Sequence, residues 1–145
     1  MRPGVLIDTG PLVAYLSPRD NHHSWAVETL ENLAPPIVTC EPVLTEACFL
    51  VAQNRLPAAA VLEPVERGRM RVGLRIEEEV MAICALMRRY ENVPMSLADG
   101  CLVRLAEMTG LPICTLDGGF EIYRAHRRRS LDLIIPPGGR SLHEP

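Results

Sequence analysis

Short apolar runs alternate with longer segments of helical periodicity along the chain. The runs are rich in Val and Ile, which is typical of short strands buried on both faces of a sheet. They cover residues 4–8, 37–40, 112–116 and 131–135. A further stretch, residues 70–74, alternates Arg with apolar side chains and predicts an edge strand with one polar face.

The segments between these strands predict helices over residues 12–16, 22–33, 42–54, 57–68, 77–90, 96–109 and 120–128. The helix over residues 42–54 is apolar almost all round, so we expect it to be deeply buried. The last of these helices, over residues 120–128, is short and basic. In the helix over residues 77–90, the side chains expected to face inward are Val80, Met81, Cys84 and Met87.

This alternation of strands and helices predicts an α/β fold with a central, mainly parallel sheet that is covered on both faces. A chain of 145 residues forms one domain by default. We expect the domain to cover residues 1–136 and to be followed by a flexible C-terminal tail over residues 137–145.

The composition indicates a well-buried protein, because 48% of the residues are hydrophobic and the mean hydropathy is +0.09. No apolar run reaches the roughly 20 residues needed to span a bilayer. The N-terminus lacks the apolar core of a signal peptide, so we expect a cytoplasmic protein. The five cysteines form no C-x-x-C pair, which favours buried free thiols over a thiolate metal site.

Every one of the 15 basic residues is arginine, and the net charge is −3. Arginine suits bidentate contacts with phosphate, although a codon bias explains its exclusive use more simply. The dense basic cluster of the chain consists of Arg124, His126, Arg127, Arg128 and Arg129. It could hold RNA phosphates, or it could be the solvated C-terminus of a helix, where cations are favourable.

Asp8 stands where the first apolar strand ends and a helix begins. Ligands of open parallel α/β sheets bind just beyond the carboxyl ends of the strands, which makes Asp8 a candidate site residue. An equally good interpretation is that Asp8 is the N-cap of the following helix and accepts amide hydrogen bonds from the turn.

Glu46 has only apolar residues three and four positions away along its predicted helix. A carboxylate on a buried stripe costs several kcal/mol unless it is paired or binds a metal. Glu46 is also too far into the helix to be a cap, which favours a functional role. The alternatives are an ion pair with an arginine such as Arg104, or a helix orientation that exposes Glu46.

Two further acids have ordinary structural interpretations. Asp99 lies three residues after Ser96, which is the spacing of a capping box, and the same spacing puts it in the first turn of its helix. Asp117 follows a strand and precedes two glycines, so it could be a turn residue. Its setting nevertheless repeats that of Asp8, with a strand, an acid, a tight turn and a helix in succession.

A functional interpretation is better supported for the four acids together than for any one of them, because parallel strands would bring them to one edge of the sheet. Two carboxylates about 4 Å apart repel by about 4 kcal/mol at an effective dielectric constant of about 20. Such a cluster needs cations or shared protons. All-oxygen ligation favours Mg²⁺ or Mn²⁺ over zinc, and carboxylate-held Mg²⁺ is typical of phosphate chemistry.

The order of these acids in the segments LIDTGPLVAYL, VLTEACFLV, SLADGCLVRLAE and TLDGGF resembles that of PIN domains, most closely the VapC-like toxin ribonucleases. The resemblance runs from about residue 5 to about residue 135. It implies a three-layer α/β/α sandwich and a Mg²⁺- or Mn²⁺-dependent endoribonuclease, usually a homodimer. In the toxin members it also implies an antitoxin protein as partner.

By this resemblance, the four acidic positions of the family, which hold metal and carry catalysis, are matched by Asp8, Glu46, Asp99 and Asp117. Thr9 matches the hydroxyl residue after the first acid. Thr115 matches the Thr of the T-x-D motif, whose hydroxyl could orient Asp117.

Two positions depart from the family pattern. The family often has a further acid two residues after the fourth, where this chain has Gly119, and often has Ala at the position of Gly100. The missing acid leaves one ligand fewer and could weaken a second metal site, but it does not imply inactivity.

We therefore expect a metal-dependent endoribonuclease that is the toxin of a toxin–antitoxin pair. Metal bound at the four acids would offset the net negative charge, and the expected RNA contacts are Arg124, Arg127, Arg128 and Arg129. One alternative is a PIN-domain nuclease that processes RNA outside toxin–antitoxin pairs. Others are a non-catalytic RNA- or protein-binding module that keeps the fold, and a flavodoxin-like binding domain whose acids serve as caps.

Overall fold

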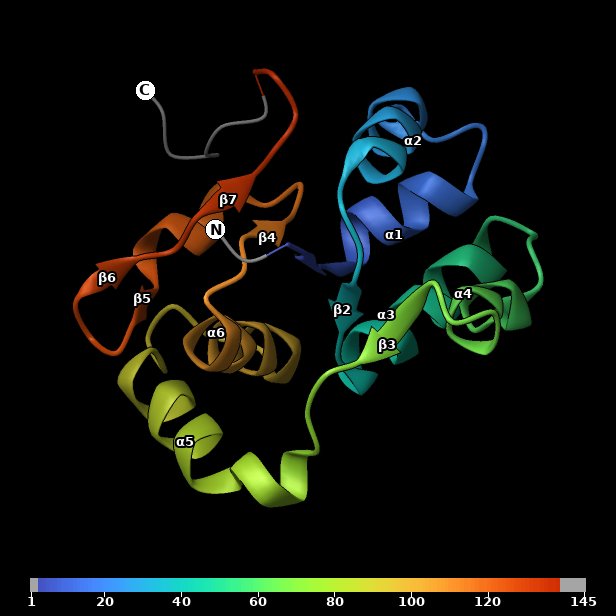
Figure 1. The fold of residues 1–145 in the computed structure, drawn as a ribbon. Coiled ribbons are helices and arrows are strands. Elements are labelled where there is room, and N and C mark those ends of the chain that lie inside the picture. Colours follow the sequence, from blue (N-terminus) through green and yellow to red (C-terminus); the bar gives the residue numbers. More distant parts are fainter. Residues whose placement is uncertain (1–2, 139–145) are drawn as a thin grey trace.

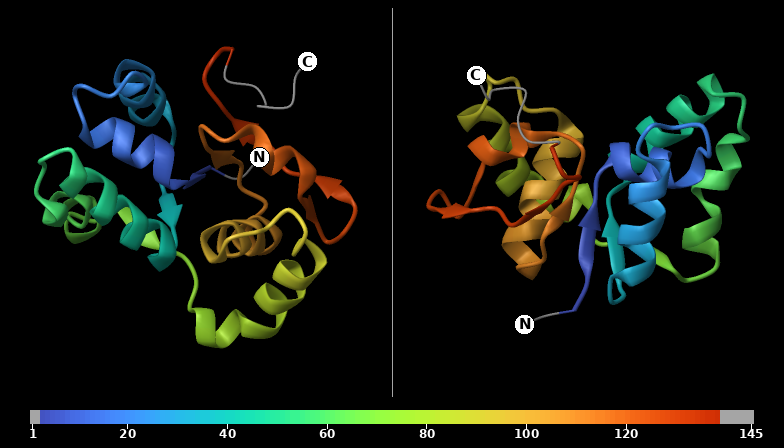
Figure 2. Two further views of the ribbon diagram at one scale, coloured as in Figure 1. Left: turned by 180° about the vertical axis from the view of Figure 1, so that it is seen from behind. Right: turned by 90° about the horizontal axis from the view of Figure 1, so that it is seen from above.

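A computed structural model describes residues 3–138, which form a three-layer α/β/α sandwich (Figure 1). Helices α1 (Thr9–Leu16) and α2 (His23–Asn32) lie on one side of the central sheet, and α5 (Ile76–Arg89) and α6 (Leu97–Thr109) lie on the other. Figure 2 shows the same two groups of helices from behind and from above. The predicted fold class is confirmed.

The central sheet has five strands in the order β3-β2-β1-β4-β7, and all of its pairings are parallel. Each strand is short; they are β1 Val5–Ile7, β2 Ile37–Thr39, β3 Met70–Val72, β4 Ile113–Cys114 and β7 Leu133–Ile134. The middle strand β1 is completely buried, as its three apolar residues predict. Strand β3 is an edge strand, as predicted from its alternating pattern.

The register of the strands determines which residues meet at the carboxyl edge of the sheet. Leu6 of β1 is aligned with Val38 of β2 and with Ile113 of β4. Because the three strands are parallel, the chain leaves all of them at the same edge. Asp8 follows β1 and Thr115 follows β4, so these two polar residues emerge side by side.

The region after β2 contains one long helix and two short ones. Helix α3 (Glu41–Gln53) packs against α1 and is followed by the 3₁₀ helix η1 (Ala58–Val61) and the single turn α4 (Glu63–Glu66). A continuous helix over residues 57–68 is therefore wrong. Pro64 lies in the first turn of α4, where its missing N–H is not needed, so it begins a new helix instead of kinking an old one.

The basic segment near the C-terminus does not form the helix predicted over residues 120–128. A 3₁₀ helix, η2 (Gly118–Ile122), leads into a small antiparallel hairpin of β5 (Arg124–Ala125) and β6 (Arg129–Ser130). Between the two strands, His126 and Arg127 have φ values of 50° and 69°. These values are left-handed and interrupt a right-handed helix, so the segment turns back on itself.

The predicted inward face of α5 is wrong for Val80 and Met81 and right in part for Met87, which is half-buried and packs against the core. The buried side chains of this helix are Ile83 and Leu86, whereas Val80 is exposed and Met81 is 86% exposed. The helix packs against α6, so one narrow stripe is enough to attach it to the core. Val80 and Met81 therefore lie on its outer face.

None of the helices within residues 3–138 is both long and apolar enough to cross a lipid bilayer. Most of the predicted flexible tail, residues 139–145, lies outside the described residues.

Candidate functional site

One cavity at the carboxyl edge of the sheet is lined by all four acids that the sequence singles out. Its volume is about 200 Å³, and its lining residues are Asp8, Thr9, Gly10, Glu46, Ser96, Ala98, Asp99, Leu116 and Asp117. Two larger hollows, of about 310 and 890 Å³, contain none of these acids. The acids follow β1, lie in α3, begin α6 and follow β4, so it is the fold that brings them together.

Asp8 is held by a hydrogen bond to each of its carboxylate oxygens. Oδ1 accepts from the Thr9 amide at 2.8 Å, as expected of the N-cap of α1, and Oδ2 accepts from the Thr115 hydroxyl at 2.8 Å. Burial raises the pKa of Asp8 to about 6; both hydrogen bonds oppose the rise, and the charges of Asp99 and Glu46 add to it. The capping role is therefore real, and it fixes the carboxylate at the cavity.

Thr115 connects two of the acids through one fully buried hydroxyl. Its Oγ1 donates to Asp8 Oδ2 and accepts from the backbone N–H of Asp117 at 2.9 Å. The family resemblance predicts that this hydroxyl orients Asp117. The structure shows that it holds Asp117 by its backbone and orients the carboxylate of Asp8.

Asp99 lies in the first turn of α6 and has two roles there. Ser96 is the N-cap, and its hydroxyl accepts from the Asp99 amide at 3.1 Å, so the capping pattern predicted from the spacing is present. The Tyr123 hydroxyl donates to Asp99 Oδ2 at 3.1 Å. Burial raises the pKa of Asp99, the hydrogen bonds from Tyr123 and Ser96 oppose the rise, and the charge of Asp117 adds to it.

Tyr123 is a site residue that the sequence did not reveal. Its side chain is only 3% exposed, and its ring meets those of Tyr90 and Phe120 edge to face, with centroid distances of 5.0 and 5.4 Å. These two rings hold the phenol against Asp99. The available signal was a tyrosine six positions after Asp117, but the wrong helix prediction for this segment concealed its direction.

Glu46 lines the cavity from α3, but the reason given for it was wrong. Its side chain is exposed, and so is Phe49 beside it, because α3 buries only the stripe that contains Val43, Ala47 and Val51. The orientation that exposes Glu46 is therefore the correct alternative. Glu46 and Asp8 line the same cavity, and the charge of Glu46 adds to the rise in the pKa of Asp8.

The other explanation for Glu46, an ion pair with Arg104, is also wrong. The Arg104 guanidinium pairs with Glu79 at 2.9 Å and with Glu107 at 3.3 Å. Within residues 3–138, Glu46 forms no ion pair, so its carboxylate faces the cavity without a cationic partner.

Asp117 lies in an exposed turn, and its Oδ1 accepts from the Gly119 amide at 2.7 Å. The predicted turn role is thus present together with the cavity position. A Cβ atom added at Gly119 would lie 2.8 Å from Asp117 Oδ1. A further acid at position 119 would therefore displace the Asp117 carboxylate from this turn, which is why glycine suits the site.

The cavity also contains a buried hydroxyl with no partner. Thr9 is 3% exposed, and its Oγ1 forms no hydrogen bond with any residue of the described part of the chain. Buried polar groups are nearly always hydrogen-bonded, and this hydroxyl lies beside the four acids without such a partner. The all-oxygen donor set fits a hard divalent cation such as Mg²⁺ or Mn²⁺.

The four carboxylates nevertheless lie too far apart to form a complete metal site. Among the described residues, no three Asp, Glu, His or Cys side chains are close enough to hold one ion. Glu46 and Asp117 are exposed, so rotation of their side chains is the simplest way to bring further oxygens to an ion beside Asp8 and Asp99.

The arginines expected to contact RNA lie in the β5–β6 hairpin, beside α6. Arg124 is half-buried, and its guanidinium donates to the carbonyl oxygens of Glu121 and Tyr123. Arg127, Arg128 and Arg129 are exposed. Arg124 is therefore a structural anchor, and the accessible cations are the other three.

Comparisons with known proteins agree with this architecture. The chain is similar in fold to the crystal structure of VapC20 from Mycobacterium tuberculosis, a toxin that cleaves the sarcin–ricin loop. The TM-score is 0.62 at 20% sequence identity, and the alignment covers 74% of this chain and 84% of VapC20. The sequence matches no curated protein. The family model of the PIN domain matches residues 5–135, and the protein therefore belongs to the PIN-domain family.

Proposed function

We propose that the protein is a divalent-metal-dependent endoribonuclease with the role of a VapC-like toxin. The observation that carries this function is the cavity lined by four carboxylates from four separate segments of the chain. Membership of the PIN-domain family and a fold shared with a toxin that cleaves RNA support a nuclease. Four acids around one small cavity are also hard to explain by capping alone, because Glu46 caps nothing.

The residues proposed to hold Mg²⁺ or Mn²⁺ are Asp8, Glu46, Asp99 and Asp117. Bound there, the ion would activate a water molecule and offset the charge of the scissile phosphate. The chain contributes the positions of the oxygens, since Thr115 holds Asp8 and Tyr123 holds Asp99. The unpaired hydroxyl of Thr9 is available to donate to a phosphate oxygen.

The decisive experiment compares RNA cleavage by the wild type and by Asp8→Asn, with Mn²⁺ or Mg²⁺ and with EDTA. We expect the substitution to lower kcat/KM by about 1000-fold, about 4 kcal/mol, because it removes a charge that the cation requires. EDTA should abolish cleavage by the wild type. Asp132→Asn is the matched control, since Asp132 is exposed and lies outside the cavity.

Equal activity of the wild type and Asp8→Asn would rule out this mechanism. If neither protein cleaves any RNA with either metal, the chain is instead a non-catalytic RNA- or protein-binding module with the same fold.

The proposed toxin role implies a substrate, a protein partner, an oligomeric state and a cellular location. We propose an RNA substrate, an antitoxin protein that binds the toxin, a homodimeric assembly and a cytoplasmic location. The fold shared with VapC20 favours this role over that of an RNA-processing nuclease outside toxin–antitoxin pairs. Expression of the wild type should arrest growth, and the product of a neighbouring small gene should reverse the arrest. Growth unaffected by active enzyme would favour RNA processing, and light scattering of the purified protein would test the dimer.

A further inference from the structure

The β5–β6 hairpin has a conformation that needs support from outside. Arg124 is aligned with Ser130 and Ala125 with Arg129, so the hairpin is only two residue pairs long. Its turn contains His126 and Arg127 in left-handed conformations. Residues with side chains rarely adopt such conformations, and two residue pairs do not stabilise a hairpin in water.

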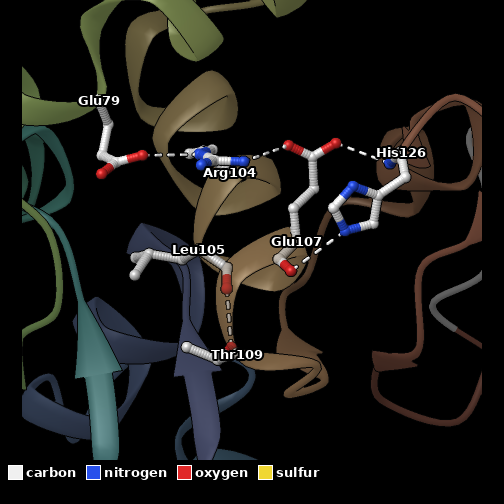
Figure 3. A network of polar contacts seen from close by, with 6 residues as sticks. All are labelled: Glu79, Arg104, Leu105, Glu107, Thr109 and His126. Atoms are coloured by element: carbon white, nitrogen blue, oxygen red, sulfur yellow. Dashed lines mark hydrogen bonds and ion pairs between the residues drawn. The ribbon is translucent and has the colours of Figure 1, made fainter.

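The support comes from Glu107 on α6 (Figure 3). Its Oε2 accepts from the backbone N–H of His126 at 2.7 Å, and its backbone carbonyl accepts from His126 Nε2 at 3.2 Å. The other carboxylate oxygen, Oε1, accepts from Arg104, which also pairs with Glu79 of α5. The Glu107 side chain is only 8% exposed. One nearly buried carboxylate thus attaches the turn of the hairpin to two helices.

The root of the hairpin is attached at the acid cavity. The Tyr123 hydroxyl reaches Asp99 in the first turn of α6, and the next amide, that of Arg124, donates to the Tyr90 hydroxyl at 3.1 Å. Glu107 lies eight residues after Asp99, a rise of about 12 Å along the helix. The hairpin therefore follows α6 from the cavity to its last turns, on the side of the molecule away from α1–α4 (Figures 1 and 2).

The free surface of this hairpin is cationic. Arg127, Arg128 and Arg129 are exposed, and none of them forms an ion pair with any residue between 3 and 138. One oxygen of the Glu107 carboxylate faces Arg104 and the other faces the backbone N–H of His126, and neither pairs with these three arginines. The tip, residues 126–130, contains no Phe, Tyr or Trp on which a base could stack.

We infer that the β5–β6 hairpin is a phosphate-binding element that grips single-stranded RNA beside the cleavage cavity, and that Glu107 is its positioning residue. This rests on the proposed function, because it extends the substrate site of the same enzyme. Arginine side chains held in a defined shape bind phosphate oxygens in a bidentate manner. Contacts of this kind hold the RNA backbone and do not select its bases.

The first test measures binding without cleavage, using fluorescence anisotropy of a labelled single-stranded RNA in EDTA. The variant is R127Q/R128Q/R129Q, and the matched control is R67Q/R69Q/R71Q, which removes three exposed arginines near the opposite edge strand. Each phosphate contact to a single strand makes the slope of log K against log salt steeper by about 0.7. The hairpin variant lacks three arginines, so its slope should be shallower than that of the wild type by about 2.

The same contacts predict the size of the change in affinity. Between about 50 and 200 mM salt, the wild type should lose about 20-fold more affinity than the hairpin variant. The control should keep the slope of the wild type. Equal slopes for the hairpin variant and the wild type would overturn the inference, and so would an equal loss in the control. If the hairpin variant keeps its RNA affinity but loses binding to a protein, the cationic surface serves that protein and the inference is wrong.

The second test separates the shape of the hairpin from its charge. Glu107→Gln and Glu79→Gln remove the same negative charge, but only the first disturbs the contact with His126. Electrostatics alone predicts that both variants bind RNA more tightly. We expect Glu107→Gln to bind several-fold more weakly than Glu79→Gln, and to raise KM with little change in kcat. If Glu107→Gln binds RNA as tightly as Glu79→Gln, or more tightly, Glu107 does not position the hairpin.

Failure of this inference can be distinguished from failure of the proposed function. If the wild type cleaves RNA and the hairpin variant binds RNA with unchanged affinity, only the inference about the hairpin is overturned. A wild type that neither binds nor cleaves RNA would overturn both. The unfolding midpoints of all variants should be measured, so that a loss of binding is accepted only from folded protein.

Discussion

The two halves of the acid cavity are built differently. Asp8 and Asp99 are partly buried, and each is fixed by hydrogen bonds from neighbouring hydroxyl or amide groups. Glu46 and Asp117 are exposed; Asp117 accepts one bond from its own turn, and Glu46 is held by no ion pair with a described residue. The inner pair is held in place by more contacts than the outer pair.

This difference explains the energetics of the cavity. Burial raises the pKa of both inner acids, so bringing their charges into the site is unfavourable without a counter-ion. The outer acids, Glu46 and Asp117, are exposed to water. Asp8 and Asp99 would hold a cation in positions fixed beforehand, and Glu46 and Asp117 would supply further oxygens by rotating their side chains.

The largest effects should come from removing an inner acid. We expect Asp8→Asn and Asp99→Asn each to lower kcat/KM by about 1000-fold, since both remove a preorganised charge. Glu46→Gln and Asp117→Asn should cost less, about 10- to 100-fold, because fewer contacts hold these exposed carboxylates in place. Kinetics with a single RNA substrate and saturating Mn²⁺ would measure all four. Equal losses at inner and outer positions would show that the distinction has no catalytic meaning.

The next effect concerns the hydroxyl that holds Asp8. Thr115→Val keeps the shape but leaves the Asp117 amide without its partner, which should cost about 1–3 kcal/mol of stability. It should also weaken Mn²⁺ binding by about 10- to 100-fold. Thr39→Val is the matched control, because Thr39 is equally buried at the end of β2 but donates to the carbonyl of Ile7.

Calorimetric titration with Mn²⁺ and thermal unfolding would separate the two effects. Both variants should unfold at lower temperature, and only Thr115→Val should lose metal affinity. A loss of affinity in Thr39→Val of the same size would mean that metal binding simply follows stability.

A smaller effect is expected from the hydroxyl that holds Asp99. Tyr123→Phe keeps the ring contacts and removes one hydrogen bond to the carboxylate, so Mn²⁺ binding should weaken by about 10-fold. Tyr90→Phe also removes one buried hydroxyl, but this hydroxyl accepts from the Arg124 amide and does not contact an acid. Unchanged affinity in Tyr123→Phe would show that its hydroxyl does not position Asp99.

The smallest effect is the pH dependence of the metal-free protein. The folded-state pKa of Asp8, about 6, lies above its usual value of 3.8, so the folded chain holds this proton more tightly than the unfolded chain. The stabilisation is complete below the unfolded pKa and is lost as the pH rises through about 6. Urea unfolding in EDTA should therefore show a greater advantage of wild type over Asp8→Asn at about pH 5 than at about pH 7. A difference that is independent of pH would contradict the raised pKa.

Much of the inner half could be predicted from the sequence. The apolar run before Asp8 and the turn after it define a strand, an acid and a helix within a few neighbouring residues. Asp99 has the same local character, because Ser96 marks the start of its helix. Strand alternation then predicts a parallel sheet, and a parallel sheet brings these positions to one edge.

The outer half and the supporting residues depend on distant contacts. Glu46 was selected because its helix looks buried all round, but the side of α3 that is covered is decided by its packing against α1 and η1. The same limit applies to Met81, which lies on an uncovered face of α5. The direction of Tyr123 depends on a hairpin whose turn is held by Glu107, a residue of another helix.

Helix α6 serves both ends of the proposed RNA site, and this has a consequence for where the RNA is cut. Its first turn carries Asp99, and Glu107, two turns further along, carries the hairpin. A helix has a constant rise, about 1.5 Å per residue, and it does not stretch. If the hairpin holds RNA as inferred, the spacing of Asp99 and Glu107 along α6 would fix the number of nucleotides between the bound phosphates and the cleaved bond.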